Sequence, residues 1–158
     1  MQDLTIREVS LTDDVLALLI ALSADWEAEN SCRGYRKNGR ADIEGNRIFL
    51  AEAGTETVGY LFGHVEHARE ASTVMPAGTP YFEIEELYVR PAARSQGVGQ
   101  RLFRFTEEAV RGTADFLMLG TATKDHRAIL HFYLDELGME FWSARLFKPL
   151  SDTPVTAI

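Results

Sequence analysis

The stretch "YFEIEELYV" (residues 81–89) reads as a largely buried strand, yet it carries the acidic residues Glu83, Glu85 and Glu86. Charged side chains are rare in buried strands unless they are paired or have a function. A carboxylate in such a place can take a proton from a substrate, directly or through a water molecule. In a regular strand, Glu83 and Glu85 share a face with Leu87, and Glu86 points the other way. Glu83 and Glu85 are therefore candidate bases; the alternative is that they are ordinary charges beside the exposed mouth of a sheet.

A glycine turn follows this strand in "RPAARSQGVGQRLF" (residues 90–103). Pro91 cannot continue a central ladder, and Gly97 and Gly99 open the next helix. Glycines let a ligand approach the backbone closely, and the first N–H groups of a helix have no internal partner. Four arginines accompany the turn, with no acidic residue between Leu87 and Thr106: Arg90, Arg94, Arg101 and Arg104. This pattern predicts an anion site, best suited to phosphate.

Two common phosphate-binding motifs are absent from the turn. The chain has no Gly-x-x-x-x-Gly-Lys-Ser/Thr run, so it has no P-loop. The third glycine of a dinucleotide fingerprint falls at Leu102, a packing position. The remaining pattern is Arg94-Ser-Gln-Gly97-Val-Gly99, and the alternative is a plain helix N-terminus with solvated arginines.

The other residues with chemical potential carry weaker signals. Cys32 lies in the polar stretch "NSCRGYRKNGR", which favours a loop thiol over a nucleophile. It is the only cysteine, so the chain forms no intramolecular disulfide and no CxxC metal pair. His64 and His67 are too few for a metal site, and we expect none.

The hydrophobic pattern predicts the elements that hold these residues. Thr12 is expected to cap a helix that reaches Trp26, and a turn near Gly54 to join two strands in a hairpin. The strands are expected over 4–10, 47–54, 57–67, 81–89, 114–122 and 139–147, and later helices over 98–109 and 124–137. The run 114–122 reads as a strand buried on both faces. Strands that pair early and alternate with helices later indicate a mixed α/β sheet, and we expect a single domain over 1–158.

Composition limits the partners. The chain has 158 residues, 46% of them hydrophobic and 25% charged, with a formal net charge of −8. This charge disfavours nucleic-acid binding and suits a cationic small substrate. The N-terminus lacks a signal-like pattern and no apolar run could span a bilayer, so we expect a cytoplasmic protein without membrane partners.

The run "IEELYVRPAARSQGVGQRLF" (residues 84–103) resembles the acetyl-CoA-binding motif of the GNAT superfamily of N-acetyltransferases. The resemblance implies a mixed, mostly antiparallel central sheet with helices on both faces. It also implies that the N–H groups of residues 95–100 bind the pyrophosphate, and that the main chain of Leu87 and Val89 pairs with the pantetheine arm. The cofactor-binding set implied in this way is Leu87, Tyr88, Val89, Arg94, Ser95, Gln96, Gly97, Val98, Gly99, Gln100 and His126.

The run "AILHFYLDELGM" resembles the end of the same family's motif set, in which Tyr133 would protonate the coenzyme thiolate. Two departures accompany the likeness. His126 stands where an asparagine often contacts the pantetheine arm, and the spacing from Tyr133 to Gly138 is one residue longer than usual. His126 and His131 are alternative acids. Related enzymes use acids that match Glu83 or Glu85 as the base, and a bulge in the strand could change which of them faces the substrate.

The resemblance implies an enzyme that moves an acetyl group from acetyl-CoA to a primary amine of a small molecule or a peptide. No positioned cysteine argues for an acyl-enzyme, so a direct attack in a ternary complex is expected. The alternative is a catalytically silent acyl-CoA-binding or sensor module on the same fold. Substrate choice is expected to reside in the loops 29–46 and 68–80, and a homodimer is an open alternative to a monomer.

Overall fold

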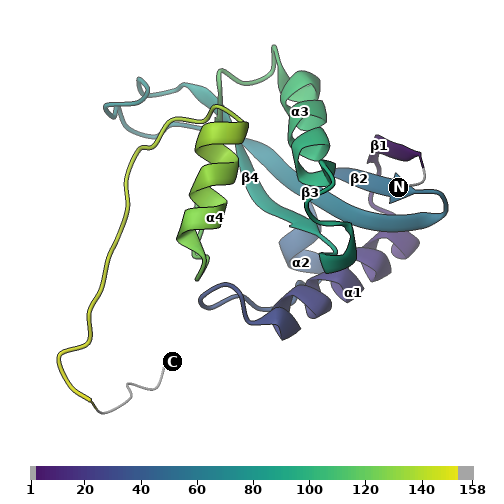
Figure 1. The fold of residues 1–158 in the computed structure, drawn as a ribbon. Helices are drawn as coiled ribbons and strands as arrows, with labels where there is room; N and C mark the ends of the chain where they lie inside the picture. The colour runs from purple at the N-terminus through teal and green to yellow at the C-terminus, as the bar shows by residue number, and fades with distance from the viewer. Residues whose placement is uncertain (1–2, 153–158) are drawn as a thin grey trace.

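The computed structural model describes residues 3–152, which form a five-stranded sheet in the order β1-β2-β3-β4-β5 (Figure 1). The first four strands are antiparallel to their neighbours, and β5 is parallel to β4. The strands are β1 (Leu4–Val9), β2 (Arg47–Ala53), β3 (Glu56–His67), β4 (Pro80–Val89) and β5 (Phe116–Met118). The mixed, mostly antiparallel sheet that we expected is therefore confirmed.

Helices cover both faces of this sheet. Helix α1 (Asp13–Glu29) packs Leu19 and Leu22 on one face, together with the short α2 (Arg40–Ile43). Helix α3 (Val98–Val110) packs Leu102 and Phe103 on the other face. Helix α4 (His126–Leu130) continues as the wider helix η2 (His131–Glu136) on the same side as α3 (Figure 1). Each face of the sheet thus has its own apolar core.

Local signals set several boundaries as expected. The Thr12 hydroxyl accepts a hydrogen bond from the Val15 N–H at 3.2 Å and caps α1. Gly54, at φ 63°, lies in the turn that joins β2 to β3. Gly112, at φ 89°, follows the end of α3, and Gly138, at φ 73°, follows the end of η2.

The expected strand over 114–122 was largely wrong. Strand β5 has three residues, which pair with Tyr81–Glu83 of β4. Phe116 is 38% exposed, so the strand is not buried on both faces. The physical reason is its place at the edge of the sheet, where, within the described residues, β4 is its strand neighbour on one side only.

The expected strand over 139–147 was wrong. Residues 139–152 contain no strand, and those from 140 to 152 are exposed. A strand needs a neighbour to pair its backbone groups, and this segment runs away from the sheet (Figure 1). Within residues 3–152 no helix is both long enough and apolar enough to cross a membrane.

Candidate active site

A β-bulge in β4 decides where its acidic side chains point. Phe62 of β3 lies opposite Glu86, and the next residue, Gly63, lies opposite Ile84, so Glu85 is the extra residue. Ile84 and Leu87 therefore share the α3 face of the sheet. The expectation that Glu83 and Glu85 share a face with Leu87 was wrong, because it assumed an unbroken two-residue repeat.

The bulge brings Glu83 and Glu85 together near His64. Glu83 lies opposite His64 in the β3–β4 ladder, and the Glu85 carboxylate is 3.7 Å from His64 Nδ1. Burial raises the pKa of Glu83, and the negative charge of Glu85 raises it further. His64 is also held by Asn46 Oδ1 and by the Glu66 carboxylate, each at 2.9 Å. The two candidate bases thus lie beside a histidine whose position is fixed.

A hollow of about 360 Å³ opens beside this cluster. Its acidic lining comes from Asp42, Glu44 and Glu85, with Asn46 and His64 between them. The arrangement can attract and hold a cationic group.

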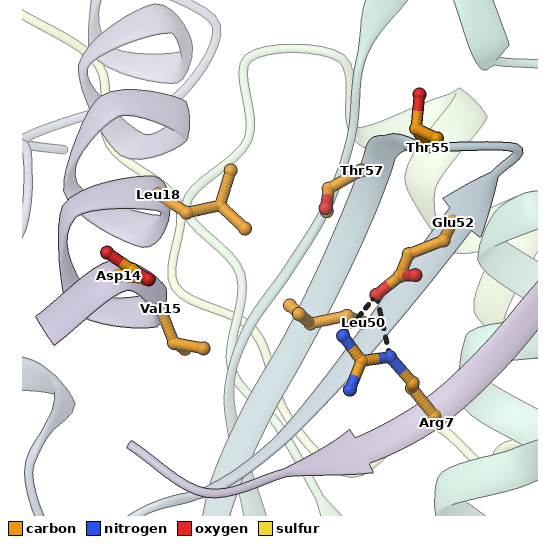
Figure 2. A pocket seen from close by; sticks show the side chains of 8 residues that line it. All are labelled: Arg7, Asp14, Val15, Leu18, Leu50, Glu52, Thr55 and Thr57. Atoms are coloured by element: carbon orange, nitrogen blue, oxygen red, sulfur yellow. Dashed lines mark hydrogen bonds and ion pairs between the residues drawn. The ribbon is translucent and has the colours of Figure 1, made fainter. Parts of the chain in front are cut away.

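A second hollow, of about 260 Å³, lies between α1 and the strands β1 to β3 (Figure 2). In this hollow, Arg7 Nη2 lies 2.7 Å from the Glu52 carboxylate. No residue that we singled out from the sequence lines it, so it does not belong to the candidate site.

Glu86 has a role in this region that the sequence did not reveal. Its Oε1 atom accepts hydrogen bonds from the Tyr60 hydroxyl at 2.7 Å, from the Tyr35 hydroxyl at 2.9 Å and from Asn38 Nδ2 at 2.9 Å. Burial raises its pKa, and these three bonds offset part of the rise. Glu86 therefore ties the loop after α1 to β3 and β4.

The sequence placed Glu86 on the face opposite to Glu83, but this was wrong, because the ladder sets the two residues opposite Phe62 and His64, which share one face of β3. The partners of Glu86 come from distant segments and left no local signal.

The edge of β4 beyond Glu83 is open on the side of β5. The β4–β5 ladder covers only Tyr81 to Glu83. The Arg90 N–H donates to the Val58 carbonyl at 2.8 Å, so residues of alternate parity, Leu87 and Val89, turn their backbone groups away from β3. The Val89 carbonyl already accepts a hydrogen bond from Arg94 Nε at 2.9 Å. The backbone groups of Leu87 and the Val89 N–H can pair with an extended ligand, and this pairing stays a prediction.

The glycine turn lies at the end of this edge and is exposed. Ser95 has φ 61° and Gly97 has φ 82°, and Gly97 is the N-cap of α3. The Gln96 side chain donates to the Ala92 carbonyl at 3.0 Å, which braces the turn. Residues 94–97 of the turn are exposed, whereas Val98, the first residue of α3, is 1% exposed. The backbone groups of the turn are therefore the ones at the surface, and their contact with a phosphate stays a prediction.

Arg94 is held by protein groups. Its Nη2 atom lies 2.8 Å from both carboxylate oxygens of Glu29, and its Nε donates to the Val89 carbonyl at 2.9 Å. The guanidinium also lies 5.6 Å from the centre of the Tyr88 ring. Arg94 therefore joins the turn to α1, and its contact with a ligand stays a prediction.

Gly99 provides space for Phe132 of η2. A Cβ atom built on Gly99 would lie 3.0 Å from Phe132 Cζ and 3.8 Å from Val89 Cγ2. The first turn of α3, the end of β4 and η2 converge at this point. The close approach explains a glycine here without any ligand.

Tyr133 lies half-buried on η2. Its ring lies 5.0 Å from that of Phe132 and 6.4 Å from that of Phe103. Burial raises the pKa of Tyr133 to about 12, and Cys32 adds to the rise. Cys32 pairs with Thr123, which brings the loop after α1 to the start of α4. Tyr133 is thus a protonated donor at neutral pH, and its catalytic role stays a prediction.

Helix η2 accommodates the additional residue between Tyr133 and Gly138. It is a π-helix, and the Leu137 N–H donates to the carbonyl of Phe132, five residues earlier, at 3.1 Å. Leu137 remains in the core at 4% exposure. The wider turn takes up one residue without rotating Leu137 off the core face.

The two histidines near Tyr133 lie in different surroundings. His126 is exposed at the first position of α4, whose N-cap is Asp125. His131 is exposed as well, and its Nδ1 lies 2.8 Å from Asp135. In the part of the chain that the structure describes, no group of three or more His, Cys, Asp or Glu side chains could hold a metal ion.

Comparison with known proteins identifies the family. The sequence model of the Acetyltransferase (GNAT) family matches residues 15–139, which hold the glycine turn, the β4 acids and Tyr133. The chain belongs to this family. No curated protein matches the chain significantly.

Solved structures share the fold. A transcriptional regulator from Bacillus halodurans C-125 is 23% identical with a TM-score of 0.68, over 94% of this chain and 100% of that one. An aminoglycoside acetyltransferase from an uncultured soil metagenomic sample is 17% identical with a TM-score of 0.65, over 94% and 97%. A Trypanosoma brucei acetyltransferase is 19% identical with a TM-score of 0.64, over 94% and 100%. At these identities the likeness concerns the fold.

Proposed function

We propose that this acetyltransferase moves an acetyl group from acetyl-CoA to a primary amine by direct attack in a ternary complex. One observation carries the proposal. Strand β4 offers an open edge at Leu87 and Val89 and leads to an exposed glycine turn, and the same strand holds Glu83 and Glu85 a few residues earlier. A strand rises about 3.3 Å per residue, so the acids lie within reach of a group held along that edge.

The open edge and the turn fit the two halves of the coenzyme. The amide-bearing pantetheine arm can pair with Leu87 and Val89 as an added strand does. The free N–H groups at the start of α3 suit the pyrophosphate. Because Arg94 is paired with Glu29, the backbone groups of the turn supply most of the attraction in this proposal.

The acidic hollow fits the acceptor amine. A free alkylammonium has a pKa of about 10.4, so only about one molecule in a thousand is neutral at pH 7. Asp42, Glu44 and Glu85 would attract the cation, and Glu83 or Glu85 would take its proton before attack. The raised pKa of Glu83 makes its carboxylate a stronger proton acceptor than a free carboxylate is.

Tyr133 would stabilise the leaving thiolate. The thiol of coenzyme A resembles that of free cysteine, with a pKa of about 8.5. Because the pKa of Tyr133 is raised to about 12, complete proton transfer to the thiolate is uphill. A hydrogen bond from the phenol to the developing negative charge is the role that fits this pKa.

The experiment is a panel of primary amines, assayed for release of the coenzyme A thiol with and without each amine. Two solved aminoglycoside acetyltransferases share the fold, and one of them was solved with sisomicin, so polycationic amines belong in the panel beside peptides with lysine. We expect amine-dependent release that falls in Glu83→Gln or Glu85→Gln, with unchanged acetyl-CoA binding by calorimetry. Binding of acetyl-CoA with no release for any amine would instead support a silent acyl-CoA-binding module.

A further inference from the structure

His64 joins the two walls of the acidic hollow. One wall is the segment 41–46, which runs from α2 to Asn46, and the other consists of His64 and Glu85. His64 Nδ1 lies 2.9 Å from Asn46 Oδ1. Within residues 3–152, this contact is the one side-chain hydrogen bond between the residues of the two walls. The shape of the hollow therefore depends on it.

The orientation of the Asn46 amide is fixed by its own backbone contacts. Its Nδ2 atom donates to the carbonyl of Asp42 at 3.1 Å and to that of Ile43 at 3.0 Å. The amide oxygen is therefore the atom that faces His64. Because an amide oxygen only accepts hydrogen bonds, the hydrogen of this contact belongs to His64 Nδ1.

The second ring nitrogen of His64 also faces an acceptor. His64 Nε2 lies 2.9 Å from the Glu66 carboxylate, and an ionised carboxylate only accepts. A neutral imidazole carries one N–H and can make one of these two hydrogen bonds, whereas an imidazolium makes both. The two contacts together therefore favour the protonated ring.

Acidic side chains lie around this ring on three elements. They are Glu66 on β3, Glu83 and Glu85 on β4, and, across the hollow, Asp42 of α2 and Glu44, which follows it. Burial and the charge of Glu85 raise the pKa of Glu83, and the positive charge of His64 lowers it. A protonated His64 thus offsets part of the rise and favours the ionised form of Glu83.

We propose that His64, in its imidazolium form, is a positioning residue of the acceptor site, which ties the α2 wall to β3 and keeps Glu83 ionised to receive the proton of the amine. This role rests on the proposed transfer to an amine. Loss of one ring proton would leave a nitrogen lone pair facing an acceptor and would also remove the positive charge. Because histidine side chains change charge between about pH 5 and 8, the acceptor site should respond to pH in this range.

Two amide substitutions separate the two hydrogen bonds of the ring. The amide nitrogen replaces Nδ1 in His64→Asn and Nε2 in His64→Gln, and both variants lack the charge. We expect His64→Asn to leave KM for the amine nearly unchanged, because the contact with Asn46 is kept. His64→Gln should raise this KM roughly fivefold, because the α2 wall loses one hydrogen bond. An equal KM in the two variants overturns the tie between the walls.

The pH dependence of kcat tests the role of the charge. With sisomicin, or the amine of the panel that reacts fastest, the ratio of wild-type kcat to that of His64→Asn cancels the ionisation of the shared acceptor. We expect a ratio of about ten at pH 6 that falls toward one at about pH 8.5, where histidine has lost its charge and Glu83 is ionised without it. Acetyl-CoA affinity should be equal in the two proteins. A ratio that stays constant with pH overturns the role of the charge.

NMR without an amine tests the His64–Asn46 contact independently of the proposed function. The side-chain amide signals of Asn46 are expected to shift between about pH 5 and 8 in the wild type and to shift much less in His64→Asn. Equal shifts in both proteins overturn the proposal, even if amines are acetylated. If the signals differ as expected and no amine is acetylated, the contact is supported and the proposed function is wrong.

Discussion

One carboxylate oxygen of Glu86 accepts three hydrogen bonds, and the burial of this residue should make the stability of the fold depend on pH. Because burial raises its pKa above 4.5, the folded state binds its proton more tightly than the unfolded state does. The stability that the proton on Glu86 contributes to the folded state is fully present below pH 4.5, and it is lost as the pH rises through the pKa of the folded state.

We expect Glu86→Gln to remove this pH dependence, because the amide keeps an acceptor oxygen and does not titrate. The free energy of unfolding of the wild type minus that of the variant should decrease as the pH rises above about 4.5. Urea unfolding at a series of pH values measures the difference. A difference that stays constant or grows with pH would show that Glu86 is not held at a raised pKa.

Tyr133 gives the second prediction at this scale. Tyr133→Phe keeps the ring against Phe103 and Phe132 and deletes only the hydroxyl. We expect kcat to fall roughly a hundredfold, with acetyl-CoA affinity and melting temperature nearly unchanged. Since the pKa of Tyr133 is raised to about 12, its ionisation should leave no alkaline limb in the wild-type rate below about pH 10. A Phe variant with wild-type turnover, while chemistry limits the rate, would exclude Tyr133 and turn attention to His126.

At the scale of elements, the π-helix η2 accounts for a spacing that the sequence left unexplained. Each residue of a regular α-helix turns the chain by about 100°, so one extra residue would carry Leu137 off the core. The five-residue hydrogen bond from Leu137 to Phe132 takes up the extra residue.

Deleting the exposed Asp135 should convert this turn into a regular α-helical turn and keep Leu137 in the core. We expect the free energy of unfolding to change by less than about 1 kcal/mol, since α geometry replaces the rarer π geometry. The matched control is Leu137→Ala, which is expected to cost about 2–5 kcal/mol. Chemical denaturation compares the three proteins. A deletion as costly as Leu137→Ala would mean that the π turn holds the core by some other contact.

Sequence predicted those elements whose signals are local. The cap at Thr12 and the glycines at 54, 112 and 138 act through their own backbone conformation, and the structure has each where it was expected. The bulge at Glu85 could not be predicted in the same way, because it is defined by the register with β3. The prediction of a last strand over 139–147 was wrong for a related reason. An alternating pattern shows that a segment can pair with a strand, but it does not show whether a neighbouring strand is within reach.

In the candidate site, too, the sequence predicted the residues that have local signals and could not predict the contacts between distant segments. The glycine turn, Leu87, Val89 and Tyr133 follow from contiguous motifs, and the roles that the resemblance implies for them stay predictions. The positions of Glu83 and Glu85 depend on the bulge, and the hydrogen bonds of Glu86 depend on Tyr35 and Asn38 in the loop after α1. These contacts join segments far apart in the chain, so spacing alone could not show them.

At the scale of the whole molecule, the net charge of −8 should steer a cationic acceptor toward the acidic hollow. We expect kcat/KM for a polycationic amine to fall as ionic strength rises, because salt shortens the Debye length to about 8 Å at 0.15 M. Initial rates at low acceptor concentration measure this effect. A primary amine with a single positive charge serves as the control, and its kcat/KM should fall less because its attraction to the hollow is weaker. If kcat/KM for the amine does not depend on salt, the charge of the hollow does not contribute to acceptor binding.

The central claim is direct acetyl transfer from acetyl-CoA, held along β4 and the glycine turn, to an amine held beside Glu83 and Glu85. Initial rates of coenzyme A release, with both substrates varied, test it most directly. Double-reciprocal plots should give intersecting lines, because both substrates must be bound before the acetyl group moves. Parallel lines would indicate an acyl-enzyme intermediate, and release that does not depend on the amine would contradict acetyl transfer to an amine altogether.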